Sequence, residues 1–338
     1  MIFEGSRCPP GSSHRDREGS GSPPWHRDDD GEGTHCPQGS VHRRTQGTGC
    51  PISLRRGDAE GARRLRGIAG PITVDLYSVL LTLAGVLSKT ASGGEDGVLD
   101  SGDFGVLTIT KSITIFSEGL GAGVFLAGTK GVVVNAASTD VVILRGLDIE
   151  GLGTGLGGIT VLGNLKALHV EKCTINNFRG ANASGIEIAT SVVGTTQVFI
   201  KDTIVRNNGQ GTGGGIFMNS TGSAIVKASL DNVRMENNIF GLKCQGTSTC
   251  SVNNSVAAGN SAAGFSAFAG TAVLNIERSV SANNGTGLVC NAGTTVRIGN
   301  SSIFGNTTAV TTGGSCFTFK NVDSDATIVP PFIQGSPQ

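Results

Sequence analysis

The chain has 338 residues and balances 26 Lys and Arg against 26 Asp and Glu, so its total charge points to neither a polyanion nor a membrane surface as partner. It contains 53 Gly but only 14 Phe, 1 Tyr and 1 Trp, which argues against a core built from large rings. The composition is also unlike a coiled coil, and the glycines lack the triplet period of collagen. It indicates a turn-rich β protein in which small residues allow close backbone approach.

Residues 1–70 differ from the rest of the chain. They contain arginine but no lysine, the run Asp28-Asp29-Asp30, and four of the five histidines. Neither a period of two nor one of 3.6 is visible, so we expect a disordered tail. The composition resembles that of GC-rich DNA translated outside the true reading frame, so this segment is a candidate non-native start. Cys8, Cys36 and Cys50 do not have the spacing of zinc ligands, and we expect no metal site there.

Residues 71–92 are the one helix-like stretch, with apolar side chains at helical spacing from Val74 to Leu87. This run is too short to span a bilayer. One interpretation is a signal peptide cleaved near Ala91-Ser92. The other, which we favour, is an amphipathic helix that caps the open end of a solenoid.

From residue 93 onwards, two interleaved repeats dominate the sequence. The first is glycine followed by two apolar residues separated by one position. Its copies are Gly131–Val134, Gly158–Val161, Gly185–Ile188, Gly215–Met218, Gly241–Cys244, Gly264–Ala267 and Gly287–Cys290. The second unit alternates apolar residues and ends in Asn or Gly. Its copies begin at Val142, Leu168, Val198, Ala228, Cys250, Leu274 and Val296.

Alternation at period two makes each unit a strand with one inward and one outward face. One coil buries little by itself, but stacked coils pile their inward residues into columns. Two such columns are Val134/Val161/Ile188/Met218/Cys244/Ala267/Cys290 and Leu144/Val170/Ile200/Leu230/Val252/Ile276/Ile298. We therefore predict an all-β protein: a right-handed parallel β-helix of eight to nine coils over residues 93–325, with a C-terminal tail at 326–338.

Outward positions also form columns. One of them reads Arg145, Glu171, Lys201, Asp231, Asn253 and Glu277. The alternating signs predict a salt-bridge ladder that sets register. Repeated asparagines at the ends of the second unit predict left-handed turn positions and stacked amides.

Several phrases give the chain a family resemblance. They are Leu83–Glu95, Val98–Gly105, Thr108–Ile115, Lys166–Cys173 and Asn275–Asn284. Over residues 83–325 the chain resembles the right-handed parallel β-helix proteins of the pectate-lyase-like (pectin-lyase-fold) superfamily. More narrowly, it resembles a bacterial group of β-helix repeat proteins with no assigned activity. The resemblance implies a carbohydrate-related solenoid and favours the cap over the signal peptide.

Enzymes of the superfamily cleave acidic polysaccharides, and the resemblance implies clustered acids that hold Ca²⁺ beside an arginine, or three aspartates in one groove. Neither cluster is visible in this sequence. Arg145, Asp148 and Glu150 share one coil and are the best acid–base candidates. His169 is the one histidine of the repeat region and is expected to be an incidental surface residue. Aromatic side chains that could stack on sugars are scarce, and Phe199 and Phe217 are outward by parity but isolated.

The cysteines of the repeat region leave the redox compartment open. Cys173, Cys244, Cys250 and Cys290 fall on inward positions, where a free thiol acts as a small apolar residue. Cys244 and Cys250 flank one turn and could pair in an exported protein, whereas Cys244 and Cys290 are two coils apart and too distant.

Two functions remain open. The first is a non-catalytic β-helix that binds a carbohydrate or a protein surface through its outward strand faces. The second is a polysaccharide lyase or glycoside hydrolase acting on an acidic glycan. We expect no cofactor, no nucleic acid partner and no membrane span, and an extracellular or periplasmic location if the true N-terminus carries an export signal.

Overall fold

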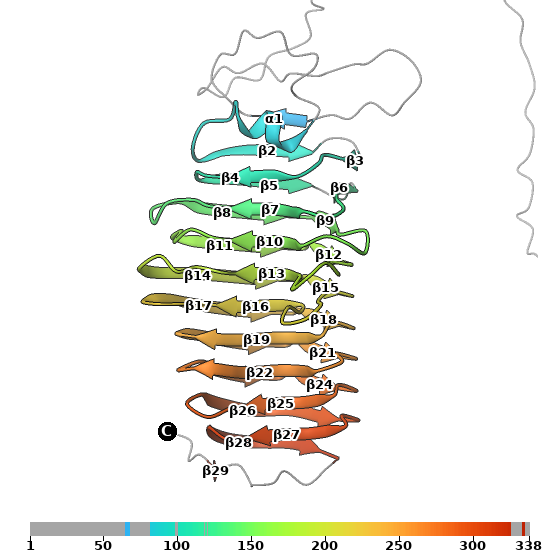
Figure 1. The fold of residues 1–338 in the computed structure, drawn as a ribbon, viewed down its shortest axis with the longest axis vertical. Helices are drawn as coiled ribbons and strands as arrows, with labels where there is room; N and C mark the ends of the chain where they lie inside the picture. The colour runs from blue at the N-terminus through green and yellow to red at the C-terminus, as the bar shows by residue number, and fades with distance from the viewer. Residues whose placement is uncertain are drawn as a thin grey trace, which may run out of the picture. The chain divides into compact units, whose positions relative to one another are not determined.

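The computed structural model describes residues 65–67, 82–98, 101–117, 119, 121–325 and 333–334. In this part of the chain the strands stack coil over coil as a parallel β-solenoid of about nine turns (Figure 1). The expected β-helix is therefore confirmed. Each coil contributes one strand to each of three parallel ladders, which form the three faces of the solenoid.

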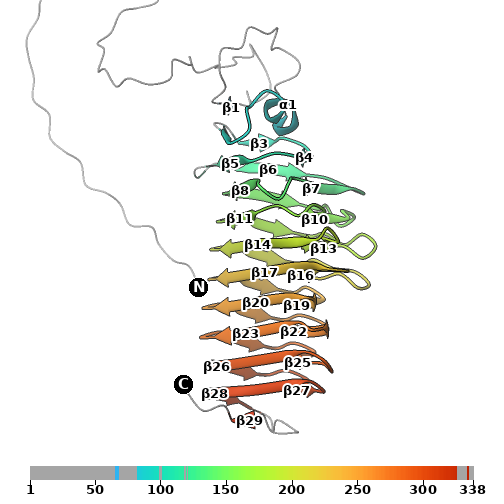
Figure 2. The ribbon, with the colours of Figure 1, turned by 90° about the vertical axis from the view of Figure 1, so that its left-hand side faces the viewer.

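The long-strand ladder faces the viewer in Figure 2. Its members are β2 Gly94–Val98, β5 Ile113–Ser117, β8 Val141–Arg145, β11 Ala167–Glu171, β14 Gly194–Lys201, β17 Ala224–Asp231, β20 Ser248–Asn253, β23 Val273–Glu277, β26 Thr295–Phe304, β28 Ser315–Ser324 and β29 Ile333–Gln334. The short-strand ladder continues each coil around a corner. It contains β3 Gly102–Asp103, β6 Ala122–Phe125, β9 Leu147–Glu150, β12 Thr174–Asn176, β15 Ile204–Arg206, β18 Arg234–Glu236, β21 Val256–Ala258 and β24 Val280–Ala282.

The third ladder is a separate nine-stranded sheet. It contains β4 Leu107–Ile109, β7 Lys130–Val134, β10 Gly157–Val161, β13 Ser184–Ile188, β16 Ile216–Asn219, β19 Phe240–Gly246, β22 Ala263–Gly270, β25 Thr286–Cys290 and β27 Thr308–Thr312. The other two ladders, together with β1 Leu65–Gly67, form one twenty-stranded sheet. They meet in β26, which pairs with both β23 and β24.

The register confirms both predicted inward columns. Val170 pairs with Leu144 on one side and Ile200 on the other, and all three side chains are at most 1% exposed. In the third ladder, Val161 pairs with Val134 and Ile188 in the same way. Branched aliphatic side chains stacked in this manner fill the interior without large rings, which accounts for the low aromatic content.

A buried asparagine ladder runs beside the core. Its members are Asn208, Asn238, Asn260, Asn284 and Asn306. From Asn238 onwards, each side-chain oxygen accepts from the backbone N–H of the member one coil earlier, as between Asn238 and Asn260 at 3.0 Å. Asn208 Oδ1 accepts from Phe178 N in the same way. The predicted amide stacking is therefore confirmed, and it satisfies donors that the corner would otherwise bury unpaired.

This ladder also explains the glycine that opens the copies of the first repeat from Gly185 onwards. A Cβ built on Gly264 would lie 2.7 Å from Asn284 Nδ2, and one on Gly287 would lie 2.7 Å from Asn306 Nδ2. Since real Cβ atoms do not approach so closely, only glycine leaves room for the amide. The preceding asparagines serve a different purpose: Asn207 and Asn237 have φ values of 56° and 55°, as expected for turn residues.

Helix α1, Leu83–Leu87, covers the first coil and buries Leu83, Val86 and Leu87 (Figure 1). The capping role is as expected, and the helix ends at Leu87, before the end of the predicted range 71–92. Residues 71–81 lie outside the described part. Lys111 Nζ donates to Leu87 O at 2.7 Å, which satisfies a carbonyl at the end of the helix.

Two predicted tails contain short strands. Within 1–70, residues Leu65–Gly67 form β1, which pairs antiparallel with β2, so the expected disorder does not apply to them. Unpaired groups on the edge of β2 provide the partners for this strand. Within 326–338, Ile333 and Gln334 pair with β28. The remaining residues of both tails lie outside the part of the chain that the structure describes.

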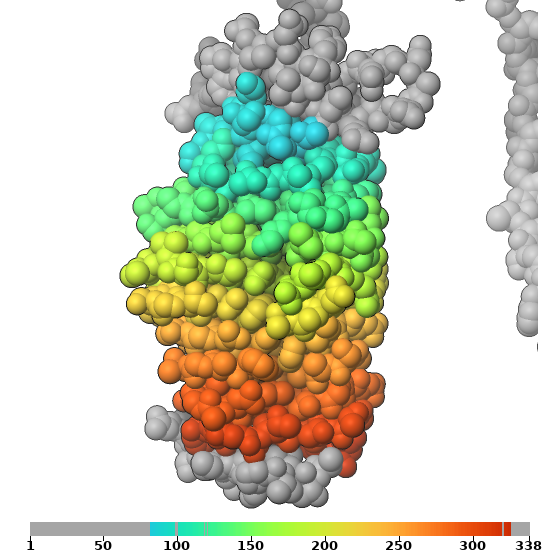
Figure 3. Space-filling model, viewed as in Figure 1, coloured from blue at the N-terminus to red at the C-terminus, as the bar shows by residue number. Residues whose placement is uncertain are grey.

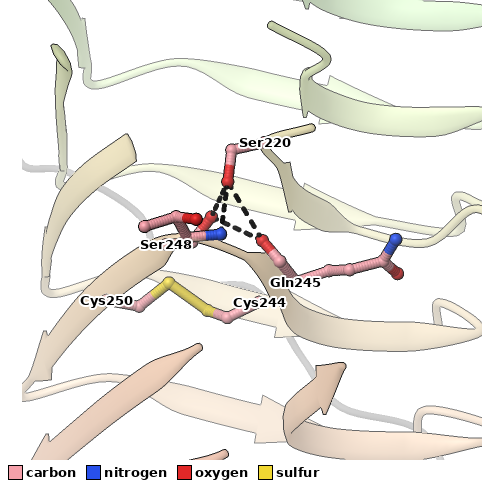
Figure 4. The surroundings of a disulfide bond; sticks show 6 residues. Ser220, Cys244, Gln245, Ser248 and Cys250 are labelled. Carbon is pink, nitrogen blue, oxygen red and sulfur yellow. Dashed lines mark hydrogen bonds between the residues drawn. A yellow bond between two sulfur atoms is a disulfide. The ribbon is translucent and has the colours of Figure 1, made fainter. Parts of the chain in front are cut away.

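Two disulfides cross-link the later coils. Cys244–Cys250 joins β19 to β20 across one corner, as the sequence allowed for an exported protein (Figure 4). There Ser220 Oγ accepts from Thr247 N at 2.8 Å, and Ser248 Oγ donates to Gln245 O at 2.7 Å. Cys290–Cys316 joins β25 to β28 and was not foreseen. The view of these inward cysteines as free thiols is thus corrected, except for the buried free thiol of Cys173.

Candidate functional site

A groove of about 620 Å³ lies on the outward face of the long-strand ladder, across β17, β20, β23, β26 and β28. Its floor consists of two outward columns. The first contains Ser229, Ser251, Asn275 and Arg297, and the second contains Asp231, Asn253 and Glu277. Because parallel strands repeat about every 4.8 Å, each column presents a hydrogen-bonding group at regular intervals along the solenoid axis.

The second column ends at a glycine that makes space for a carboxylate. A Cβ on Gly299 would lie 2.8 Å from Glu277 Oε2, so the glutamate side chain extends over this position. Glu277 Oε1 accepts from Asn300 Nδ2 at 2.7 Å and lies 3.7 Å from the Arg278 guanidinium. Asp231 Oδ1 accepts from Asn254 Nδ2 at 3.1 Å. Both carboxylates are therefore fixed in place as hydrogen-bond acceptors.

The first column ends against aromatic side chains. The Arg297 guanidinium lies 5.9 Å from the centre of the Phe317 ring, and its Nη1 donates to Asn275 Oδ1 at 3.4 Å. Phe319 lines the same end of the groove. The groove thus combines hydroxyl, amide, carboxylate and guanidinium groups with an apolar end wall.

Asn253 lies in the centre of the second column. Its Oδ1 is shielded from water and accepts no hydrogen bond from any residue in the described part of the chain. An unsatisfied buried acceptor costs about 1–3 kcal/mol.

Of the three acid–base candidates predicted from sequence, Asp148 and Glu150 lie on one strand and Arg145 lies on another. Asp148 and Glu150 lie together on β9, facing outward. The pKa of Asp148 is raised, chiefly by loss of hydration and also by repulsion from Glu150, while Arg206 opposes the shift. Glu150 Oε2 accepts from Asn176 Nδ2 at 2.5 Å. The sequence reading missed Asn176 and Arg206, although both occupy the column of Glu150 in the next two coils.

Arg145 is not part of that pair. Its Nε lies 3.4 Å from Glu171 Oε2, one coil along the predicted salt-bridge ladder. Among the described residues, the ladder does not continue as ion pairs: Lys201 is in register with Glu171 and Asp231 but lies within 4 Å of neither carboxylate. The later members of this column form the groove instead.

His169 and Phe199 form a small outward platform on the same face. Their rings stack with centroids 4.8 Å apart, and His169 Nδ1 lies 3.9 Å from Glu171 Oε1. The sequence had suggested that the Phe199 ring is isolated, and this expectation is wrong. The partner of Phe199 is the residue in register on the preceding coil.

Phe217 was also expected to be an isolated outward ring, but it is only 6% exposed. Lys243 Nζ lies 4.4 Å from its ring centre, and 4.9 and 4.2 Å from those of Phe240 and Phe268. The ammonium also donates to Thr212 O at 3.3 Å. Burial lowers the pKa of Lys243, and the charge of Glu187 opposes this effect.

No group of three or more His, Cys, Asp or Glu side chains within the described ranges is arranged to hold a metal ion. Within the same ranges, no helix is long and apolar enough to cross a membrane.

No protein-family model matches the chain, and no curated protein matches it. Among solved structures, the chain is similar to the crystal structure of pectate lyase Pel9A, with 15% identity, a TM-score of 0.44, and coverage of 70% of this chain and 69% of that chain. It is also similar to the periplasmic alginate epimerase AlgG, with 9% identity, a TM-score of 0.30, and coverage of 72% and 82%.

The three continuous parallel ladders and their stacked inward columns define the class of protein. The chain is a parallel β-helix of about nine turns. Its identities to the solved structures are low enough that the likeness concerns the fold alone.

Proposed function

We propose that the chain is a non-catalytic glycan-binding β-helix and that the groove on the long-strand ladder is its binding site. The observation that carries this proposal is the regular outward presentation of Ser251, Asn275 and Arg297 beside Asn253 and Glu277. Hydroxyl-rich chains bind through such acceptors and donors, and an aromatic side chain at the end of a groove can cover the apolar face of a sugar ring.

The groove suits a repeating polymer because its own groups repeat along the solenoid axis. An extended chain lying along this axis meets one outward position of each column about every 4.8 Å. The charges of Asp231 and Glu277 are matched by those of Arg278 and Arg297, so recognition rests on directed hydrogen bonds and not on net charge.

A non-catalytic role is supported by the state of the two groove carboxylates. Both accept from neighbouring amides, and Glu277 also lies beside Arg278. These contacts occupy one oxygen of each carboxylate and fix the orientation of the group. The proposal therefore assigns them to hydroxyl recognition.

Isothermal titration against neutral and acidic oligosaccharides, with and without Ca²⁺, tests this function. We expect heat of binding with at least one glycan, and an approximately tenfold loss of affinity in Asn275→Ala and Arg297→Ala. Arg234→Ala is the matched control, since Arg234 is an exposed arginine on the short-strand ladder that pairs with Glu236. The absence of binding heat with every glycan, or an equal loss of affinity in the control variant, would contradict the assignment.

A second candidate function is glycan cleavage, which the raised pKa of Asp148 next to Glu150 favours. Alternate residues on a strand lie about 6.6 Å apart, which is compatible with an acid and a base on opposite sides of a bond. Product formation from polygalacturonate or alginate that is abolished in Asp148→Asn and Glu150→Gln would establish this function instead.

A further inference from the structure

An apolar patch lies outside the groove, at the corner between the third ladder and the long-strand ladder. Its members are Leu162, Val192, Val193 and Ile225, which are 42%, 50%, 73% and 36% exposed. They come from three consecutive coils: Leu162 follows β10, the two valines precede β14, and Ile225 lies in β17. We call these four residues the corner patch.

Two of the coils that carry the corner patch extend further than the coils that follow them. Figure 1 shows the corners at β14 and β17 projecting at the left beyond those at β19 and β22, and Figure 3 shows the same convex outline. The tip is held by its neighbours: Asn164 Nδ2 donates to Val193 O at 2.8 Å, and Thr196 Oγ1 donates to Asn164 Oδ1 at 3.2 Å. The exposed valines therefore sit on a fixed projection.

Lysines flank the corner patch on two sides. Lys166 follows Leu162 in the same corner loop, and Lys227 lies two residues after Ile225 on the same face of β17. Both side chains are exposed. The nearest acid at the preceding corner, Asp140, uses both carboxylate oxygens internally. Its Oδ1 accepts from Ser112 Oγ at 2.8 Å, and its Oδ2 accepts from Ala137 N at 2.9 Å.

We propose that the corner patch docks the solenoid onto an anionic lipid surface. Aliphatic side chains on a convex tip can enter the headgroup region, and flanking lysines then meet negatively charged headgroups. A second copy of the chain fits less well, because a two-fold contact through this patch would place Lys166 and Lys227 of both copies against one another. The balanced total charge of the chain does not oppose the proposal, since the attraction is local.

Flotation of the full chain with lipid vesicles tests the proposal. We expect the wild type to float with vesicles of phosphatidylcholine and phosphatidylglycerol, less with phosphatidylcholine alone, and less again at high salt. Val193→Asp should lower partitioning by about tenfold. Lys166→Glu with Lys227→Glu should remove the preference for phosphatidylglycerol.

Leu152→Asp is the matched control, because Leu152 is 55% exposed but lies in a different loop. It should float as the wild type does, and circular dichroism should show that all variants keep the β-helix. Three results would overturn the proposal: no flotation of the wild type, unchanged flotation of Val193→Asp, or an ultracentrifugation dimer that Val193→Asp dissociates.

Discussion

Asn260 and Asn284 occupy the same buried corner position one coil apart, and two donors of Asn260 share the side-chain oxygen of Asn284. The backbone N and the side-chain Nδ2 of Asn260 lie 2.8 and 2.9 Å from Asn284 Oδ1. Asn260 Oδ1 in turn accepts from Asn238 N at 3.0 Å. This arrangement links coils by side chains where the strands end and the ladder hydrogen bonds stop.

Asn260→Ala should destabilise the solenoid strongly. The substitution removes a fully buried side chain and leaves the backbone N–H of Asn238 without its acceptor, so we expect a loss of about 2–4 kcal/mol in the free energy of unfolding. Chemical denaturation monitored by circular dichroism measures this loss. Asn253→Ala is the control because its Oδ1 has no partner within the described residues, and a loss in the control as large as in Asn260→Ala would contradict the role of the ladder.

The Cys290–Cys316 bond should secure the last coils. It closes a loop with a sequence separation of 26 residues, and the loss of such a cross-link costs about 3 kcal/mol. Cys316→Ser should therefore lower the unfolding midpoint and accelerate hydrogen exchange in β27 and β28. Unchanged exchange in these strands would contradict a stabilising bond.

The free thiol of Cys173 and the four paired cysteines should respond differently to an alkylating reagent. Burial raises the pKa of the Cys173 thiol to about 12, so it should resist alkylation in the folded protein and react after unfolding. Peptide mapping should find Cys244, Cys250, Cys290 and Cys316 alkylated only after reduction. Such bonds persist in oxidising compartments, so this result would also support the expected extracellular or periplasmic location.

The carboxyl of Asp96 should make the capped end sensitive to pH. Burial raises its pKa above 3.8, although the hydrogen bond from Thr90 and the charge of Lys111 oppose the shift. The contribution of the neutral carboxyl to stability is complete below pH 3.8 and is lost as the pH rises through the raised folded-state pKa. At neutral pH the ionised group is a net cost.

Asp96→Asn should therefore be more stable than the wild type at neutral pH, and the two should converge in acid. Thermal unfolding across this pH range measures the difference. The exposed neighbour Glu95 supplies the control, and Glu95→Gln should run parallel to the wild type. A variant that is less stable than the wild type at neutral pH would show that the charged form of Asp96 is needed.

Lys243 should restrain the loop that precedes β16. Its ammonium donates to Thr212 O and lies against three phenylalanine rings. Lys243→Met keeps the packing but removes the donor, so we expect faster hydrogen exchange at 211–214 with an unfolding midpoint close to that of the wild type. Lys201→Met alters an exposed lysine and should leave exchange in this loop unchanged. Equal exchange in the wild type and Lys243→Met would contradict the restraint.

The fold could be predicted from sequence because two conditions restrict the residue type at each inward position. The position must fit the apolar alternation of its own strand, and it must pack on the residue in register on the neighbouring coil. Val170 and Ile200 must both be apolar and must both fit one column, so the pattern survives many substitutions. The second disulfide escaped prediction because Cys316 lies in β28, beyond the last regular copy of the first repeat at Gly287–Cys290.

Outward positions lack this double constraint, which is why the site was only partly predictable. The ladder column correctly contained Asp231, Asn253 and Glu277, but their role depends on rotamers and on Arg297, Phe317 and the extra strand β28. Phe217 appeared exposed because alternation cannot show that the side chain of Lys243 covers it. Asp148 and Glu150 were brought together as expected from their spacing, whereas Arg145 turned to Glu171.

A crystal structure of the chain with a bound oligosaccharide tests the central claim most directly. We predict sugar rings lying along the groove between β17 and β28, with hydroxyls within hydrogen-bond distance of Asn253, Asn275 and Arg297. Sugar bound over Asp148 and Glu150 on the short-strand ladder, with the groove empty, would contradict the account and favour the cleavage function.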